Sequence, residues 1–191
     1  MRLVLASSSP YRRELLARLR LDFKTHSPQI DESPLPGEAA PQLALRLAEA
    51  KAAAVAAHYP NSLIIGSDQV ATSGEHLINK PGNHAAAVSQ LQAMSGRDVT
   101  FHTALCLLNS QSGRRQSSVI PVTVSMRALD KDEIERYLNA EQPYDCAGSA
   151  RIEAFGITLV EKLAGDDPNA LIGLPLIELC KMLRREGIRL P

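Results

Sequence analysis

The first twenty residues constrain the fold of this chain more than any other segment. An apolar run at residues 3–6 stops at three serines and Pro10, and a helical pattern follows at once. This order predicts a short buried strand, a tight turn and a helix with Ser9 as its N-cap and Pro10 as its first residue. A buried strand that leads directly into a helix is typical of the beginning of an α/β fold.

Two arginines, Arg12 and Arg13, lie in the first turn of this predicted helix. A cation next to the positive end of a helix dipole costs roughly 0.3–1 kcal/mol. The placement becomes favourable when an anion binds there, held by backbone N–H groups, serine hydroxyls and a guanidinium. Helical spacing places Arg12 on the face of Leu16, pointing inward, and Arg13 toward solvent. The pattern indicates an anion site at Arg12, with two surface arginines on an amphipathic helix as the alternative.

Length and charge limit the class of protein. A chain of 191 residues can bury one good core, so we expect a single domain over residues 1–191. A formal net charge of zero gives no basic field that would attract nucleic acid or an anionic membrane. The N-terminus does not resemble a signal peptide, and no apolar segment is long enough to span a bilayer. Three separated cysteines in apolar surroundings, Cys106, Cys146 and Cys180, predict reduced core thiols in a cytoplasmic protein.

Strands and helices alternate along the chain, which predicts an α/β fold with a mixed sheet flanked by helices. A proline-rich loop is expected over residues 28–41, and an alanine-rich helix over residues 42–58 with Leu43, Leu47, Ala50 and Ala54 as its buried stripe. Asp130 and Glu133 form a capping box for a later helix. The other predicted helices span residues 84–94 and 176–186, and the strands span 22–27, 63–66, 157–160 and a hairpin of 99–108 with 118–126.

Carboxylates provide the first candidates for chemistry. Asp68 follows the predicted buried strand 63–66, and open α/β sheets place ligand sites at the carboxyl ends of their strands. It is therefore a candidate metal ligand or general base, with an Asp that caps its own turn as the alternative. Glu32, in the proline-rich loop, is a second acidic candidate. Magnesium is commonly bound by one or two carboxylates together with substrate phosphates, so Glu32 and Asp68 would suffice if they converge.

Two lysines and one late glutamate complete the candidate set. Lys51 lies four residues after Leu47, beside the buried stripe of its helix, and Lys80 precedes a Pro-Gly turn. Each would be a surface lysine when considered alone, but together with Arg12 they could surround a triphosphate. Glu153 lies in a segment of small residues and could contact a base edge or simply be exposed. The scattered histidines have no metal-ligand spacing.

The order of these segments resembles the Maf family of nucleoside triphosphate pyrophosphatases. The similarity covers nearly the whole chain and rests on residues 5–13, 31–32, 50–52, 65–70, 80–81, 146–149 and 173–175. The resemblance implies an inosine-triphosphatase-like fold with a cleft between two lobes, and a possible homodimer. It is greatest to the branch of the family that acts on 7-methyl-GTP, because of Tyr11, Gln69 and Glu153. Members of that branch carry tryptophan at the position of Tyr11, and the smaller ring should stack less strongly.

This resemblance implies metal-assisted attack of water on an α-phosphate, which yields a nucleoside monophosphate and pyrophosphate. Asp68 would accept a proton from the water or bind the metal, and Glu32 would be a second metal ligand for Mg²⁺, Mn²⁺ or Co²⁺. The triphosphate would contact Ser7, Ser9, Arg12, Lys51 and Lys80, and the base would be selected by Tyr11, Gln69 and Glu153. A cation–π contact of Tyr11 with the charged 7-methylguanine ring would be worth roughly 0.5–2 kcal/mol.

Two other functions are compatible with the same residues. The first is the same hydrolysis of dTTP, UTP or another modified nucleotide, which the identities of Gln69 and Glu153 disfavour. The second is a sensor of cell division that binds a nucleotide without hydrolysing it. A sensor has no need of a carboxylate placed beside the phosphates to act with a metal, so Asp68 favours an enzyme.

Overall fold

The computed structural model describes all 191 residues, and they form two compact units. Unit 1 consists of Met1–Gln69, His102–Ile120 and Asp167–Pro191, and unit 2 of Val70–Phe101 and Pro121–Asp166. Long strands contribute residues to both units, so the chain passes from one to the other several times. The single domain and the cleft between two lobes stay predictions, and each unit is described by itself below.

The strands form one mixed sheet, which confirms the predicted α/β class. Its order is β2-β1-β3-β5-β6-β7, with β4 paired to β3. The strand β1 is parallel to both β2 and β3, whereas β4 is antiparallel to β3 and β7 is antiparallel to β6. The strands are β1 (Arg2–Ala6), β2 (Phe23–His26), β3 (Ser62–Ser73), β4 (His76–Ile78), β5 (Asp98–Asn109), β6 (Arg115–Met126) and β7 (Val160–Ala164).

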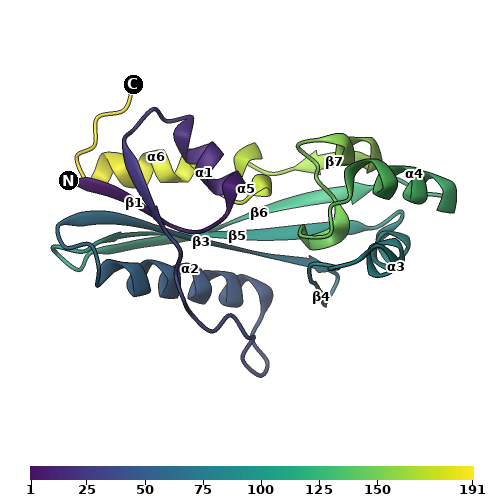
Figure 1. Ribbon diagram of the computed structural model, residues 1–191, viewed down its shortest axis with the longest axis horizontal. Helices are drawn as coiled ribbons and strands as arrows, with labels where there is room; N and C mark the ends of the chain where they lie inside the picture. The colour runs from purple at the N-terminus through teal and green to yellow at the C-terminus, as the bar shows by residue number, and fades with distance from the viewer. The chain divides into compact units, whose positions relative to one another are not determined.

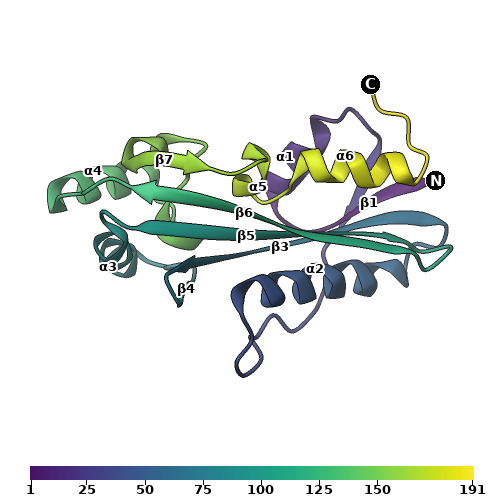
Figure 2. The ribbon, with the colours of Figure 1, turned by 180° about the vertical axis from the view of Figure 1, so that it is seen from behind.

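In unit 1, helices cover both faces of the sheet. Figure 1 and Figure 2 show α1 (Pro10–Ala17) and α6 (Leu176–Arg185) on one face of β1 and β3, and α2 (Ala40–Ala56) on the other. Side chains alternate along a strand, so odd-numbered residues of β1 and β3 point toward α1 and α6. This face is the main core, which contains Leu3, Leu5, Leu15, Leu16, Leu63, Ile65, Leu105, Leu107, Leu174, Leu176, Leu179, Met182 and Leu183.

The opposite face of β3 allows an unusually close approach of α2 at Gly66. A Cβ atom at this position would overlap the carbonyl oxygen of Ala48 and would lie 2.9 Å from the backbone nitrogen of Ala52. Only glycine has no side-chain atom there, so the helix backbone packs directly against the strand. Lys51, which precedes Ala52, is thereby held beside the residues that follow Gly66.

Unit 2 contains α3 (His84–Met94), α4 (Lys131–Glu141) and two short 3₁₀ helices, η1 (Ala147–Ser149) and η2 (Phe155–Leu159). The helix α3 packs against α4 and η1, and α4 packs against η2. The predicted capping box of α4 is confirmed. The Asp130 side chain accepts a hydrogen bond from the Glu133 backbone N–H at 2.7 Å, and the Glu133 side chain accepts one from the Asp130 backbone N–H at 3.1 Å. None of the helices is both long and apolar enough to cross a lipid bilayer.

Several predicted boundaries were wrong. The strand expected at residues 63–66 is β3, which runs on to Ser73, and residues 157–159 belong to η2 before β7 begins at Val160. The proline-rich loop ends two residues early because α2 begins at Ala40, and Ala50 and Ala54 are only half-buried. Of the three cysteines only Cys106 is fully buried. Three short elements, β4, η1 and α5 (Pro168–Ile172), were not predicted.

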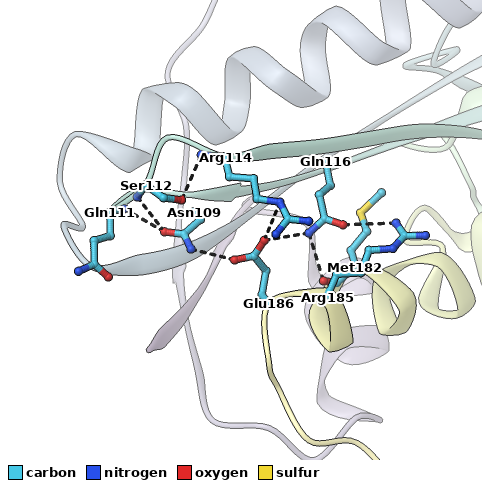
Figure 3. Close-up of polar contacts among 8 residues, drawn as sticks. All are labelled: Asn109, Gln111, Ser112, Arg114, Gln116, Met182, Arg185 and Glu186. Carbon is cyan, nitrogen blue, oxygen red and sulfur yellow. Dashed lines mark hydrogen bonds and ion pairs between the residues drawn. The ribbon is translucent and has the colours of Figure 1, made fainter.

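The end of α6 is attached to the β5–β6 hairpin by a nearly buried carboxylate, Glu186, whose side chain is 7% exposed (Figure 3). Its Oε2 accepts from the side-chain amide of Asn109 at 2.8 Å, and its Oε1 accepts from that of Gln116 at 3.0 Å. The guanidinium of Arg114 lies 3.6 Å from Oε1. These contacts join the C-terminal helix to a turn that Asn109 itself stabilises, because Asn109 Oδ1 accepts from two backbone N–H groups of the turn.

We predict that Glu186→Ala lowers the free energy of unfolding by about 2 kcal/mol, because two amide donors lose a charged acceptor. The measurement is urea unfolding followed by circular dichroism. Glu14→Ala is the matched control, since Glu14 is exposed and its ion pair with Arg18 spans 3.7 Å. Such surface pairs contribute roughly 0–1 kcal/mol. Equal midpoints and slopes for the two variants would contradict this role of Glu186.

Candidate active site

The central strand β3 carries candidate residues on both of its faces. Asp68 was expected to follow a strand, but it lies inside β3. Alternation along the strand places Asp68 on the same face as Gly66, toward α2, and places Ser67 and Gln69 on the opposite face. The hydrogen bonds agree with this division, because Asp68 contacts Lys51 of α2, whereas Ser67 and Gln69 contact α5 and the glycine that ends it.

Lys51 on α2 joins the two predicted metal ligands. Its Nζ lies 2.6 Å from Asp68 Oδ1 and 2.9 Å from Glu32 Oε1. Lys51 is only 5% exposed and Asp68 7%, whereas the Glu32 side chain is 57% exposed. The surface-lysine alternative is therefore wrong for Lys51. Glu32 and Asp68 were expected to hold a metal ion only if they converge, and their oxygens do converge, on the Lys51 ammonium.

Arg12 adds a second positive charge close to these carboxylates. Burial lowers the pKa of its guanidinium from the usual value, and the negative charges of Asp68 and Glu32 oppose that change. Its Nε donates to the carbonyl oxygen of Gly173 at 2.9 Å. As predicted, Arg12 is partly buried and Arg13 is exposed. Two carboxylates and two cations thus form a charge-balanced group in unit 1.

The turn before α1 supplies neutral donors. Ser9 is the N-cap of α1, and its Oγ accepts from the Arg12 backbone N–H at 3.3 Å. The buried Ser7 accepts from the Ser9 backbone N–H at 3.1 Å. Since each hydroxyl oxygen accepts a hydrogen bond in these contacts, its own proton can be donated to an anion. Tyr11 begins the same helix turn and is partly buried.

A short helix that sequence analysis missed, α5, orients two of the candidates. Its C-terminal Gly173 has a φ of 116°, and its carbonyl oxygen accepts from both Arg12 Nε and the buried Ser67 Oγ, the latter at 2.9 Å. The conformation of this glycine places one backbone oxygen between β3 and α1. The sequence signal was Asp167-Pro168 followed by Gly173, which is a capped start and a glycine stop around only five residues.

The side-chain amide of Gln69 is fixed by the same segment. Its Nε2 lies 2.9 Å from Thr103 Oγ1 and 3.0 Å from the carbonyl oxygens of both Ala170 and Leu171. The Thr103 hydroxyl donates to Ala170, so it is an acceptor toward Gln69. Gln69 was expected to help select the base, which an amide side chain can do through its N–H donors or its oxygen acceptor. In the structure its amide N–H groups contact the protein, which leaves the acceptor Oε1 for a ligand.

Two predicted site residues belong to unit 2. Lys80 follows β4 and is exposed. Glu153 lies before η2, and its Oε1 is 3.9 Å from the Nε of Arg151, whose Nη1 makes a shorter ion pair of 2.7 Å with Glu141. Glu153 is thus only loosely paired. The predicted association of Lys80 and Glu153 with the residues of unit 1 stays a prediction.

The chemistry of the donor set fits a divalent cation shared with a substrate. Carboxylate oxygens are hard ligands of the kind that Mg²⁺ and Mn²⁺ prefer, and the Lys51 ammonium shows that a cation is stable between Glu32 and Asp68. The chain contains no group of three or more His, Cys, Asp or Glu side chains placed to hold a metal ion. Two carboxylates completed by phosphate oxygens are a common arrangement for Mg²⁺.

Comparison with curated proteins gives relatives that match over nearly the whole chain. The 7-methyl-GTP pyrophosphatase of Methylobacillus flagellatus is 57% identical over 186 residues, which cover 97% of each chain. That of Pseudomonas fluorescens Pf-5 is 58% identical over 189 residues, 99% of this chain and 98% of the relative. Among solved structures, the Staphylococcus aureus Ham1 protein aligns with a TM-score of 0.47 and 14% identity, over 67% of this chain and 73% of that one.

A protein-family model also matches nearly the whole chain. The model described as Maf-like protein matches residues 2–186, which include every element from β1 to α6. The extent of this match and the identity to curated relatives agree with each other and with the segments that suggested the resemblance. The chain therefore belongs to the Maf family.

Proposed function

We propose that this chain is a metal-dependent nucleotide pyrophosphatase that hydrolyses 7-methyl-GTP to 7-methyl-GMP and pyrophosphate. The family and the names of relatives at 52–58% identity support the reaction and the substrate. The observation that carries the proposal for the site is the contact of Lys51 with both Asp68 and Glu32, close to the partly buried guanidinium of Arg12. Paired carboxylates and paired cations suit a reaction that joins a metal ion, a water and a polyphosphate.

Cleavage of a phosphoanhydride depends on charge neutralisation and positioning more than on covalent catalysis. The guanidinium of Arg12 is oriented through Nε by Gly173, so its remaining nitrogens can donate to phosphate oxygens. The hydroxyls of Ser7 and Ser9 add neutral donors. Lys51, together with Lys80 from unit 2, would bind the phosphates that leave as pyrophosphate. This group of donors would stabilise the negative charge that develops on the leaving group.

Asp68 is the proposed proton acceptor for the attacking water. Its Oδ1 contacts Lys51, and its Oδ2 can accept the proton or bind a metal ion. Glu32 and Asp68 would hold the divalent cation, Mg²⁺, Mn²⁺ or Co²⁺, which when bound supplies polarisation of the α-phosphate and a lower pKa for the water. The buried ammonium of Lys51, 2.6 Å from Oδ1, holds the Asp68 carboxylate in a fixed orientation before the substrate binds.

The proposed selection of the base follows from hydrogen-bond polarity. Guanine offers its N1 and exocyclic amino hydrogens as donors, so it needs acceptors in the protein. The carboxylate of Glu153 is an acceptor, and Gln69 is one as well because its Nε2 is bonded to Thr103 and α5. The ring of Tyr11 would contribute a cation–π contact with the positively charged 7-methylguanine. The cytoplasmic location and the homodimer stay predictions.

The proposal predicts release of pyrophosphate from 7-methyl-GTP in the presence of Mg²⁺, and its loss when EDTA removes the metal. The measurement is pyrophosphate release from 7-methyl-GTP, GTP, dTTP, UTP, CTP and ITP under identical conditions. A preference for dTTP or UTP would retain the phosphate site and contradict the account of base selection. Tight binding of a nucleotide without turnover of any would contradict a pyrophosphatase and indicate a sensor.

The same assay tests the role of Asp68. We expect Asp68→Asn to bind 7-methyl-GTP but to lose about 10²–10⁴-fold in kcat, the usual range for removal of a general base. Asp145→Asn is a control that makes the same change at an exposed residue of unit 2. Full activity of Asp68→Asn would contradict both the proton-acceptor and the metal-ligand role.

Base selection is tested by Glu153→Gln. We expect kcat/KM for 7-methyl-GTP to fall about 10–100-fold, because a neutral amide replaces a charged acceptor, while the melting temperature stays within the range of a surface substitution. Glu161→Gln, at an exposed position of β7, is the matched control. If Glu153→Gln keeps the wild-type preference for 7-methyl-GTP over GTP and UTP, Glu153 does not read the base.

A further inference from the structure

We propose that Lys51 holds the position of the divalent cation in the metal-free protein, and thereby couples metal binding to the arrival of the triphosphate. The inference rests on the proposed function in one respect, the participation of a metal ion at Glu32 and Asp68. It assigns to Lys51 a role that is distinct from phosphate binding. In this role the lysine is the resident counterion of the two carboxylates and must leave them before a metal ion can bind.

The Lys51 ammonium contacts both proposed metal ligands at once. A single nitrogen, Lys51 Nζ, lies 2.6 Å from Asp68 Oδ1 and 2.9 Å from Glu32 Oε1. Two oxygens from separate elements, β3 and the loop before α2, are therefore directed at one point. A metal ion that used these same oxygens would occupy the region now filled by the ammonium. Both cations cannot be bound there at once, because they would repel each other at contact distance.

The ion pair of Lys51 with Asp68 is buried, which makes either charge costly when it has no partner. Asp68 and Lys51 are both nearly inaccessible, and the close packing of α2 on Gly66 fixes the helix backbone from which Lys51 projects. In such a site water screens charge poorly, so a carboxylate without a partner is costly. The ammonium therefore has a reason to stay on Asp68 until another cation replaces it. Glu32, on an exposed loop, is free to adjust during the exchange.

The charge balance of the cluster explains why a triphosphate should favour the binding of the metal ion. Lys51 and Arg12 already neutralise Glu32 and Asp68, so a metal ion that arrives alone adds two positive charges to a neutral group. A triphosphate brings negative charge and offers new partners to the ammonium and the guanidinium. The flexible four-carbon stem of a lysine allows its head group to move from the carboxylates to phosphate oxygens. Metal and triphosphate should consequently bind together, each strengthening the other.

The test is a titration with Mn²⁺ in the absence of any nucleotide. The concentration of free Mn²⁺ is measured at each step by electron paramagnetic resonance. We expect Lys51→Met to bind Mn²⁺ about 10-fold or more tightly than the wild type, within the usual range of coupling between sites. The double variant Lys51→Met/Asp68→Asn should lose this gain, which would locate the ion at Asp68. Lys51→Gln, which can still donate to Asp68, replaces Lys51→Met if that variant does not fold.

Two control variants separate occupancy of the position from a general effect of charge. Lys24→Met removes an exposed positive charge on β2 and should bind Mn²⁺ like the wild type. Arg12→Met removes a partly buried positive charge that acts on both carboxylates without a hydrogen bond to either, so its gain should be smaller than that of Lys51→Met. Affinity of Lys51→Met no higher than that of the wild type or of Arg12→Met would overturn the inference.

The coupling is measured by repeating the titration with a non-hydrolysable triphosphate analogue present. Wild-type affinity for Mn²⁺ should rise with the analogue, and this rise should shrink about 10-fold in Lys51→Met. An equal rise in both proteins would also overturn the inference. Because the first titration contains no substrate, its result stands whether or not the protein hydrolyses 7-methyl-GTP. A failure of the proposed function is thus distinguishable from a failure of this inference.

Discussion

The ion pair between Lys51 and Asp68 joins the longest helix of unit 1 to the middle of the central strand, and the candidate site is arranged around it. Asp68 stands in a strand where an unpaired carboxylate would be strongly unfavourable, and Lys51 stands on a helix face that is otherwise apolar. Removing one partner of such a pair typically costs about 3–5 kcal/mol, because the other is left buried and charged. The absence of a side chain at Gly66 lets the two backbones approach closely enough for the pair to form.

Alternation along β3 gives the site two sides with different tasks. On the α2 side, Asp68 contacts the Lys51 ammonium, which also contacts the carboxylate of Glu32, and such groups can bind metal ions and phosphates. On the other side, Ser67 and Gln69 bond to backbone oxygens of α5 and Gly173, and the same Gly173 oxygen orients Arg12. A strand that supplies charge on one side and fixed polar groups on the other could orient the proposed proton acceptor, Asp68, and the proposed base contact, Gln69, independently.

Local signals in the sequence predicted the elements whose ends are set by neighbouring residues. Ser9 and Pro10 begin α1, and Asp130 with Glu133 begins α4, because caps act within four residues. The length of β3 could not be predicted in this way, since its apolar run ends at Gly66 while pairing with other strands extends it to Ser73. Lys51 was expected to be exposed when considered alone, and to contact a triphosphate when considered together with Arg12 and Lys80. Its burial could not be predicted locally, because it depends on Asp68, a partner 17 residues away. The resemblance to a family predicted the roles of the site residues. The pairing of Lys51 with Asp68 and Glu32 became known only from the contacts in the structure.

We propose that the metal ion and the triphosphate bind together at the Lys51–Asp68–Glu32 cluster. The most direct measurement is a crystal structure of the wild-type protein with Mn²⁺ and an α,β-methylene analogue of 7-methyl-GTP, with the metal located by anomalous scattering. The account predicts Mn²⁺ bound by oxygens of Glu32, Asp68 and the analogue, with Lys51 Nζ moved onto the phosphates. A metal ion and triphosphate bound elsewhere, with Lys51 still on both carboxylates, would contradict it.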